Sequence, residues 1–385
     1  MASTESEITD FFSSKNFETS RRFSSTLDYS TKPLLALLQR TGNPHHYFKS
    51  LHIAGTVGKG SLATYLARMI SQKTVCGLYT SPHLQTLRER IMINDHMISA
   101  NELSAIWNIV KPHPHENITY LDCLTALAFH FFAKKAPWAV IETGLGGRKD
   151  STNVILPEAS ILTTIDFDHQ NILGHTLKQI AIEKAGIIKP EKKVFSVLQN
   201  PEVMDVIQNE CRLKNAPLFI FEEKHQLYTE HNYAFARFIY LNLFNERPPA
   251  IELSIPGRFE TLNQTPLIIF DGGHNLKSVI ETAKMMKSVP GDCWNIYLNS
   301  LLERNPFDMV KHFQENLREK NINFYLLIPE QENYHIEIPA PFSQWIKPVH
   351  EIELESYLQN RHCQHLVFGS FRFYSILKKI LNKFY

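Results

Sequence analysis

The chain has 385 residues, of which 43% are hydrophobic, 21% charged and 11% aromatic, and this balance excludes a disordered or collagen-like protein. Its 40 Lys and Arg residues are balanced by 39 Asp and Glu residues, a net charge of +1, so no overall charge exists that would bind nucleic acid or an anionic membrane. At roughly 150 residues per domain, the length predicts two domains.

Strand-like runs alternate with helix-like segments over the first two thirds of the chain. The predicted strands are residues 51–54, 75–80, 139–142, 160–165 and 193–197. Such alternation is typical of a mostly parallel sheet covered by helices. We therefore expect an N-terminal α/β domain of the P-loop ATPase type, over residues 1–258.

A second series of strand-like runs begins after a turn near residues 254–260. It comprises residues 267–271, 295–298, 323–328 and 365–368, and it ends in an amphipathic helix over 374–384. The Pro-Gly pair at 256–257 favours a turn and a hinge there. This series predicts a smaller C-terminal Rossmann-like α/β domain over residues 259–385.

The cysteines and the chain start bear on the compartment. The five cysteines are scattered and form no C-x-x-C pair, so we expect no disulfide framework and no structural zinc site. No apolar stretch approaches the roughly 20 residues of a membrane span, and the first residues lack the pattern of a secretory signal. We expect a monomeric, cytoplasmic protein that binds neither membranes nor nucleic acids.

The most informative local motif is the glycine-rich segment Gly55–Ser61, which follows a predicted strand and precedes a predicted helix over 61–72. Glycines let backbone N–H groups approach an anion at the positive end of a helix. Lys59 adds a cation, and the Ser61 hydroxyl is available to a phosphate or a metal. The spacing is shorter than that of the usual P-loop, yet the context predicts a phosphate-binding loop rather than a simple turn.

Polar residues end the next predicted strands, where ligands bind in open parallel sheets. Ser81 follows the second strand, Glu142 ends the third, and His169 follows the fourth. Together with Ser61 they form a ligand set for Mg²⁺, which keeps several waters and takes phosphate oxygens. Taken singly, each has a structural alternative: a cap before Pro82, a surface charge, or a buried histidine.

Two further residues are unusual. Lys184 falls on the apolar stripe of a predicted helix, where an ammonium needs an anionic partner, a shifted pKa or a covalent change; the alternative is a side chain that reaches solvent. Asp271 ends a strand of the second domain before two glycines, a position that suits a ribose or a metal phosphate but also a helix cap.

With these motifs in order, the chain resembles the folylpolyglutamate synthase and dihydrofolate synthase family of the Mur ligase superfamily. The matching segments are residues 34–44, 55–61, 78–84, 89–91, 124–129, 142–148, 168–169, 183–188, 256–259 and 271–275. The resemblance implies an ATP-dependent ligase that joins the amino group of L-glutamate to a carboxylate of a pterin substrate. The acceptor would be dihydropteroate, a reduced folate, or both, and the reaction would pass through an acyl phosphate.

The resemblance also implies roles for individual residues. Lys59, His169 and Lys184 would be catalytic. The implied ATP-binding residues are Gly55, Thr56, Gly58, Lys59, Gly60, Ser61, Asn232, Arg258 and Asp271. The implied ligands of two Mg²⁺ ions are Ser81, Glu142, His169 and a carbamylated Lys184. The residues implied near the pterin are Thr119, Leu121, Asp122, Lys149, Asp150 and Ser151.

Three departures separate this chain from the family pattern. Val57 replaces an Asn of the phosphate loop, residues 119–122 and 149–151 differ from the usual pterin-side sequences, and residues 303–305 replace Asp-Lys-Asp. They keep two alternatives open: a Mur-type ligase acting on another carboxylate, and a nucleotide-binding protein that has lost ligation.

Overall fold

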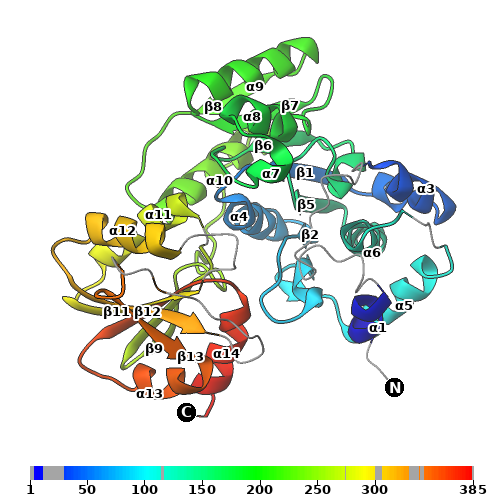
Figure 1. Cartoon of the computed structure of the whole chain (residues 1–385). Coiled ribbons are helices and arrows are strands. Elements are labelled where there is room, and N and C mark those ends of the chain that lie inside the picture. The colour runs from blue at the N-terminus through cyan, green and yellow to red at the C-terminus, as the bar shows by residue number, and fades with distance from the viewer. Residues whose placement is uncertain are drawn as a thin grey trace. The chain divides into compact units, whose positions relative to one another are not determined.

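The structure is a computed structural model that describes residues 4–11, 30–113, 117–273, 275–299, 306–328, 338 and 342–383 (Figure 1). The chain divides into two compact units: unit 1 is Met1–His225 with Thr229–Leu253, and unit 2 is Gln226–Tyr228 with Ser254–Tyr385. The boundary expected after residue 258 therefore falls within unit 2. The departure at residues 303–305 lies outside the described residues, as does His274.

Unit 1 is built on an eight-stranded sheet with the strand order β4-β3-β2-β5-β1-β6-β7-β8. The parallel strands are β1 (Lys49–Ala54), β2 (Cys76–Tyr79), β5 (Trp138–Glu142), β6 (Ala159–Leu162), β7 (Lys193–Val197) and β8 (Leu218–Phe221). All five strands predicted in this part of the chain are present. The sequence analysis missed β8 and the short antiparallel strands β3 (Ile91–Ile93) and β4 (His96–Met97).

Helices cover this sheet (Figure 1). They are α1 (Thr4–Phe11), α3 (Lys32–Arg40), α4 (Lys59–Ser71), α5 (Ala100–Val110), α6 (Tyr120–Lys135), α7 (Gln170–Leu173), α8 (Leu177–Ala185), α9 (Pro201–Leu213) and α10 (Tyr228–Phe244), with short 3-10 turns η1 (Pro44–His46), η2 (Leu87–Arg90) and η3 (Ser151–Val154). Apolar residues of α5 and α6 pack with β2 and β5 in one core, and those of α8 and α9 pack with β6 and β7 in another. These cores fix the strand ends that carry the polar residues.

Unit 2 contains a six-stranded sheet with the order β13-β12-β11-β14-β10-β9. Its strands are β9 (Glu260–Gln264), β10 (Leu267–Asp271), β11 (Cys293–Asn299), β12 (Asn321–Ile328), β13 (Ile346–His350) and β14 (Gln364–Gly369), and only β9 is antiparallel. Its helices are α11 (Leu276–Ser288), α12 (Pro306–Asn316), α13 (Leu354–Leu358) and α14 (Arg372–Leu381), with the 3-10 turn η4 (Glu351–Glu353). The predicted fold class, two mostly parallel α/β domains, is confirmed.

The expectation that the cysteines form no disulfide framework is corrected by one disulfide, which joins two of the five. Cys293 and Cys363 form a disulfide with a Cα–Cα distance of 4.7 Å, while Cys76, Cys123 and Cys211 are free and buried. The pairing of Trp294 with Gln364 brings the starts of the parallel strands β11 and β14 together. A separation of 70 residues in the sequence hides this proximity, because it arises only from the strand order.

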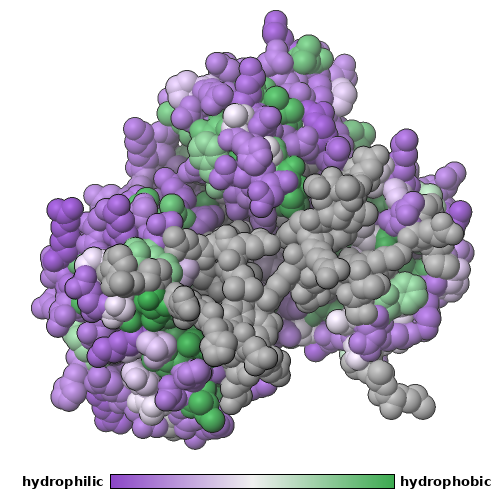
Figure 2. All heavy atoms as spheres, viewed as in Figure 1, coloured by the Kyte–Doolittle hydropathy of each residue, from purple (hydrophilic) through white to green (hydrophobic). Residues whose placement is uncertain are grey.

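The described helices include none that is long and apolar enough to cross a membrane. On the face shown in Figure 2, the described residues are mainly hydrophilic, with hydrophobic side chains in small groups. Isolated hydrophobic residues of this kind are normal on protein surfaces.

Candidate active site

The phosphate loop connects β1 to α4 and is held in place by the neighbouring connection after β6. The backbone N–H groups of Thr56 and Val57 donate to the Thr164 carbonyl at 2.8 and 3.3 Å. The Thr56 hydroxyl donates to the Asp166 carbonyl at 2.9 Å. The loop is therefore fixed by its main chain, and the N–H groups of the first turn of α4 remain as anion donors.

Two glycines of this loop have positive φ angles that side chains disfavour. Gly55 has a φ of 154°, and a Cβ there would overlap the Thr163 hydroxyl; Gly58 has a φ of 90°, and a Cβ there would lie 2.8 Å from Oδ1 of Asn232. Asn232, a buried residue of α10, therefore lies against the phosphate loop. The ATP-binding role that the resemblance implied for Asn232 stays a prediction.

Two lysines converge on one carbonyl oxygen of the loop. Nζ of Lys184 donates to the Gly55 carbonyl at 2.6 Å, and Nζ of Lys59 donates to the same oxygen at 3.2 Å. Lys184 is buried, and burial, with the charge of Lys59 as a smaller cause, lowers its pKa to about 7. Because the Lys184 side chain is buried, the alternative of a lysine that reaches solvent is wrong.

The next two strands bring Ser81 and Glu142 together. Strands β2 and β5 are adjacent and parallel, and the backbone N–H of Ser81 donates to Oε2 of Glu142 at 3.1 Å. Glu142 is buried, so it is not a surface charge. A carboxylate beside a serine, at the same edge of the sheet as the phosphate loop, supplies the oxygen ligands that Mg²⁺ prefers.

His169 lies further along this edge, after β6, which is separated from β5 by β1. Its backbone has a φ of 47°, and its Nε2 lies 3.7 Å from Oδ2 of Asp168. The side chain is partly exposed, so the buried-histidine alternative does not hold. Within the described ranges, no group of three or more His, Cys, Asp or Glu residues is arranged to bind a metal, and any ion must take other oxygens.

Two residues expected near the pterin have a structural role as well. Thr119 caps the N-terminus of α6 and forms a capping box with Asp122. Oδ2 of Asp122 accepts from the Thr119 N–H at 3.0 Å and from its hydroxyl at 2.8 Å. Burial is the main cause that raises the pKa of Asp122. One carboxylate oxygen is thus used to begin a helix.

Two of the remaining residues expected near the pterin, Leu121 and Asp150, lie beside Gly144. A Cβ on Gly144 would lie 3.5 Å from both Asp150 and Leu121 and 3.8 Å from the Ser81 hydroxyl. Asp150 is buried, Lys149 is exposed, and the Ser151 hydroxyl bonds that of Thr125 at 2.8 Å. Leu121 and Asp150 therefore lie beside the serine that the magnesium hypothesis uses.

In unit 2, Arg258 and Asp271 lie close enough to interact. Asp271 ends β10 and accepts hydrogen bonds from the Thr282 hydroxyl at 2.7 Å and the Gly273 N–H at 3.0 Å. Burial raises its pKa, and the charge of Arg258 opposes this shift. The Arg258 guanidinium lies 5.0 Å from the centre of the Phe371 ring, a cation–π contact.

Arg90 and His83 were not predicted as site residues. Arg90 is 1% exposed, and its Nε donates to Nδ1 of His83 at 2.8 Å. The Arg90 carbonyl accepts from the backbone N–H of Thr80 at 3.1 Å, so this buried arginine lies beside the residue that precedes Ser81. The signals in the sequence were the family-like segments 78–84 and 89–91, because composition and periodicity do not reveal a buried arginine.

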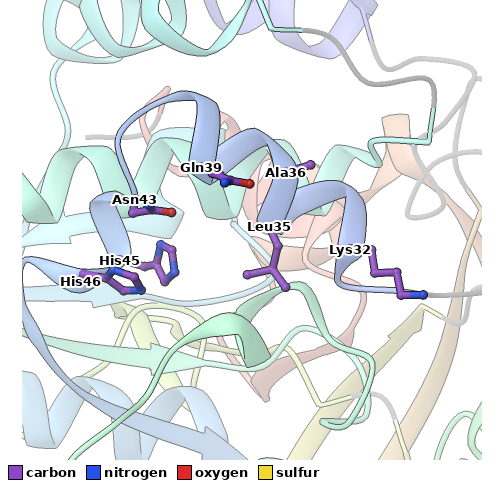
Figure 3. Close-up of a pocket in the computed structure, with 7 residues that line it drawn as sticks. All are labelled: Lys32, Leu35, Ala36, Gln39, Asn43, His45 and His46. Atoms are coloured by element: carbon purple, nitrogen blue, oxygen red, sulfur yellow. The ribbon is translucent and has the colours of Figure 1, made fainter.

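A hollow of about 470 Å³ lies between α3 and η1 (Figure 3). Its lining residues are Lys32, Leu35, Ala36, Gln39, Asn43, His45 and His46. None of the predicted site residues lines it, so it is distinct from the phosphate-loop edge.

The fold and the phosphate-loop edge define an ATP-using α/β protein. Comparison with known proteins identifies its family. Residues 53–266 match the Mur ligase middle domain. The chain is 31% identical over 344 residues to the dihydrofolate synthase/folylpolyglutamate synthase of Bacillus subtilis, covering 75% of this chain and 80% of that protein. The chain therefore belongs to the dihydrofolate synthase/folylpolyglutamate synthase family of Mur ligases.

Solved structures share the fold. The folylpolyglutamate synthase of Thermotoga maritima superposes with a TM-score of 0.81 at 23% identity, over 99% of this chain and 97% of that chain. The folylpolyglutamate synthase of Mycobacterium tuberculosis, complexed with ADP, superposes with a TM-score of 0.79 at 21% identity, over 97% of each chain.

Proposed function

We propose that this chain is an ATP-dependent ligase that joins L-glutamate to a pterin carboxylate and releases ADP and phosphate. One possible acceptor is dihydropteroate, which would be converted to dihydrofolate. The other is a reduced folate, which would gain further glutamates, and the enzyme could use one acceptor or both. The observation that carries the proposal is the convergence of Lys59 and Lys184 on the phosphate loop, at the sheet edge that also bears Ser81 and Glu142.

The phosphate loop would bind ATP through main-chain groups and one cation. The N–H groups of the first turn of α4 face the phosphates, and Lys59 exchanges the Gly55 carbonyl for phosphate oxygens. Asn232 would contact the nucleotide from α10. The acceptor carboxylate attacks the γ-phosphate, and the amine of glutamate then displaces phosphate from the acyl phosphate. Such chemistry depends on positioning and charge neutralisation.

Lys184 would act as a carbamate. Its neutral amine attacks CO₂, a C–N bond forms, and one proton is released to solvent. The product is an anion, which relieves the cost of a buried ammonium next to Lys59. This change explains why a lysine occupies a buried position on α8.

The donors present fit Mg²⁺. Ser81 and Glu142 supply hard oxygen ligands, His169 would complete the first ion's ligands, and carbamylated Lys184 would bind a second ion. When bound, Mg²⁺ would neutralise charge that develops on the phosphate oxygens. Arg258 and Asp271, at the start of unit 2, remain proposed ATP-binding residues. The monomeric state and the cytoplasmic location stay predictions.

The test is the dependence of ADP formation on the two other substrates. We expect one ADP for each glutamate ligated, and no sustained ADP release when either the pterin acceptor or L-glutamate is omitted. Sustained release without an acceptor would indicate a simple ATPase. ATP binding without any ADP formation would indicate a nucleotide-binding protein that has lost ligation. Either result would contradict the proposal.

A further inference from the structure

A polar chain runs through the core of unit 1 beneath the candidate site. Nε2 of His52, on the central strand β1, lies 2.8 Å from the hydroxyl of Thr152 in η3. Both residues are 0% exposed. The Thr152 hydroxyl in turn donates to Oδ1 of Asp150. Three polar side chains are thus linked where neighbouring positions of β1 carry Leu51 and Ile53.

Every donor around Asp150 points at its carboxylate. Oδ1 also accepts from the Thr152 backbone N–H at 2.9 Å, and Oδ2 accepts from the Leu145 N–H at 2.8 Å. Burial raises the pKa of Asp150, and the hydrogen bonds from Thr152, Leu145 and the Gly144 backbone oppose this shift. Because each of these hydrogen bonds is donated to it, the Asp150 carboxylate accepts them as an anion.

This arrangement fixes the direction of each hydrogen bond. A threonine hydroxyl has one hydrogen, and Thr152 gives it to Asp150. His52 must therefore donate from Nε2 to the Thr152 oxygen. Its Nδ1 is then the unprotonated nitrogen, and this buried atom has no hydrogen-bond partner among the residues that the structure describes. Burial lowers the pKa of His52 to about 3, which agrees with a neutral ring.

The other end of this series of hydrogen bonds, at Asp150, lies next to the candidate active site. Asp150 binds the backbone of Leu145, three residues after Glu142. A Cβ on Gly144, between them, would lie 3.5 Å from Asp150 and 3.8 Å from the Ser81 hydroxyl. Through Asp150, the position of Thr152 sets the course of the main chain that leaves Glu142 and passes Ser81.

A buried histidine with an unsatisfied nitrogen costs stability that an apolar residue would not. A histidine at this position, between the apolar residues Leu51 and Ile53, points to a task other than packing. We propose that His52 and Thr152 are positioning residues, which act through Asp150 to set the Glu142–Gly147 segment and with it the binding of the pterin acceptor. The kinetic part of this inference rests on the proposed function.

The experiment compares Thr152→Val, which removes the hydroxyl at nearly constant shape, with Thr152→Ser, which keeps it. The first readout is amide hydrogen exchange at Leu145, which needs no activity. We expect exchange at least about tenfold faster in Thr152→Val and close to wild type in Thr152→Ser, because protection follows local opening. His52→Gln, which retains a donor, should fall between them.

The second readout is the KM-against-kcat split of ligation. In Thr152→Val we expect the KM for the pterin acceptor to rise at least about tenfold, with the KM for ATP unchanged, since small displacements near a site have large effects. Thr152→Ser should restore the wild-type value. An equal rise in the KM for the pterin acceptor and the KM for ATP would overturn the positioning role. Equal KM values in Thr152→Val and Thr152→Ser would overturn it as well.

The two readouts separate the failure of this inference from failure of the proposed function. Unchanged Leu145 exchange in Thr152→Val overturns the chain of hydrogen bonds whether or not the enzyme ligates pterins. Faster exchange with normal pterin kinetics overturns the positioning role alone. A wild-type protein that ligates no pterin contradicts the proposed function, and the hydrogen-bond chain is then judged by Leu145 exchange and its recovery in Thr152→Ser.

Discussion

The phosphate-loop region of unit 1 and the region proposed to contact the pterin, around Asp122 and Asp150 and called the pterin side, are built in different ways. The phosphate loop is fixed by main-chain hydrogen bonds, from Thr56 and Val57 to Thr164, and by glycines whose φ angles side chains disfavour. On the pterin side, the carboxylates of Asp122 and Asp150 are themselves structural, because each accepts hydrogen bonds from backbone N–H groups.

This difference has a consequence for sequence changes. A loop held by its main chain tolerates side-chain substitutions that leave its glycines and its lysine in place. A region held by carboxylates cannot exchange them without changing both stability and the surface offered to the substrate. We therefore expect side-chain substitutions in the phosphate loop to change nucleotide binding little. We expect substitutions of the carboxylates to change the choice of acceptor.

The largest expected effect on activity comes from removing a charged group at the phosphate-loop edge of the sheet. Lys59→Ala and Glu142→Ala should each lower kcat by about 10²- to 10³-fold, because preorganised charge supplies much of such catalysis. Steady-state ADP release and thermal unfolding measure the effect and the integrity of the fold. Lys135→Ala, at an exposed ion pair with Glu102, is the control. Near-normal turnover in either site variant would contradict the proposed site.

The next effect joins activity and stability at Lys184. Its lowered pKa means that the unfolded chain binds more protons than the folded chain between pH 7 and 10.5. The destabilisation of the folded state by Lys184 is therefore complete below pH 7, and it disappears as the pH rises toward 10.5. Lys184→Met should abolish ligation in buffer that contains CO₂. In CO₂-free buffer at pH 7, the same change should raise the free energy of unfolding by about 2–4 kcal/mol.

Denaturant unfolding at several pH values checks this expectation, and the gain should shrink toward pH 10.5. The control is Lys192→Met, which removes a partly exposed lysine paired with Glu158. A Lys184→Met protein that is less stable than wild type at pH 7 would show that the ammonium is stabilised in the core, against the account given for it.

A smaller effect on stability and on acceptor kinetics is expected from a substitution at Asp122, and it distinguishes the pterin side from the phosphate loop. Asp122→Ala should lower the free energy of unfolding by about 1 kcal/mol through loss of the capping box. It should also change kcat/KM for the pterin acceptor by about tenfold, which corresponds to about 1.4 kcal/mol, and leave the KM for ATP unchanged. Glu102→Ala is matched, because Ser99 and Glu102 form the same box on α5. Equal kinetics in both variants would make Asp122 purely structural.

The smallest effect is expected at Val57. Because its backbone pairs with Thr164, Val57→Asn, which restores the usual family residue, should change the KM for ATP by less than about threefold, under about 1 kcal/mol. Initial rates at varied ATP measure it. A tenfold gain would show that the side chain, rather than the main chain, limits nucleotide binding here.

The sequence predicted what depends on local patterns. The glycine-lysine segment after β1, Ser81, and Glu142 at the end of β5 all lie at the predicted edge of the sheet. Features that depend on tertiary proximity were not predictable. The Cys293–Cys363 disulfide needs the order of β11 and β14, and the contact of Asn232 with Gly58 needs the position of α10.

Short antiparallel strands were missed for a related reason. β3 and β4 contain three and two residues, too few to establish a period. Asp122 illustrates a different limit, because the same Thr-x-x-Asp pattern is a helix cap and a candidate substrate contact at once.

The most direct test of the central claim is the product mass after incubation with Mg-ATP and L-glutamate, in parallel with dihydropteroate and with tetrahydrofolate. We predict that at least one acceptor gains the mass of a glutamate residue; a gain by dihydropteroate identifies dihydrofolate synthesis, and a gain by tetrahydrofolate identifies polyglutamylation. If neither acceptor gains mass while ATP binds, the chain is not a pterin-glutamate ligase.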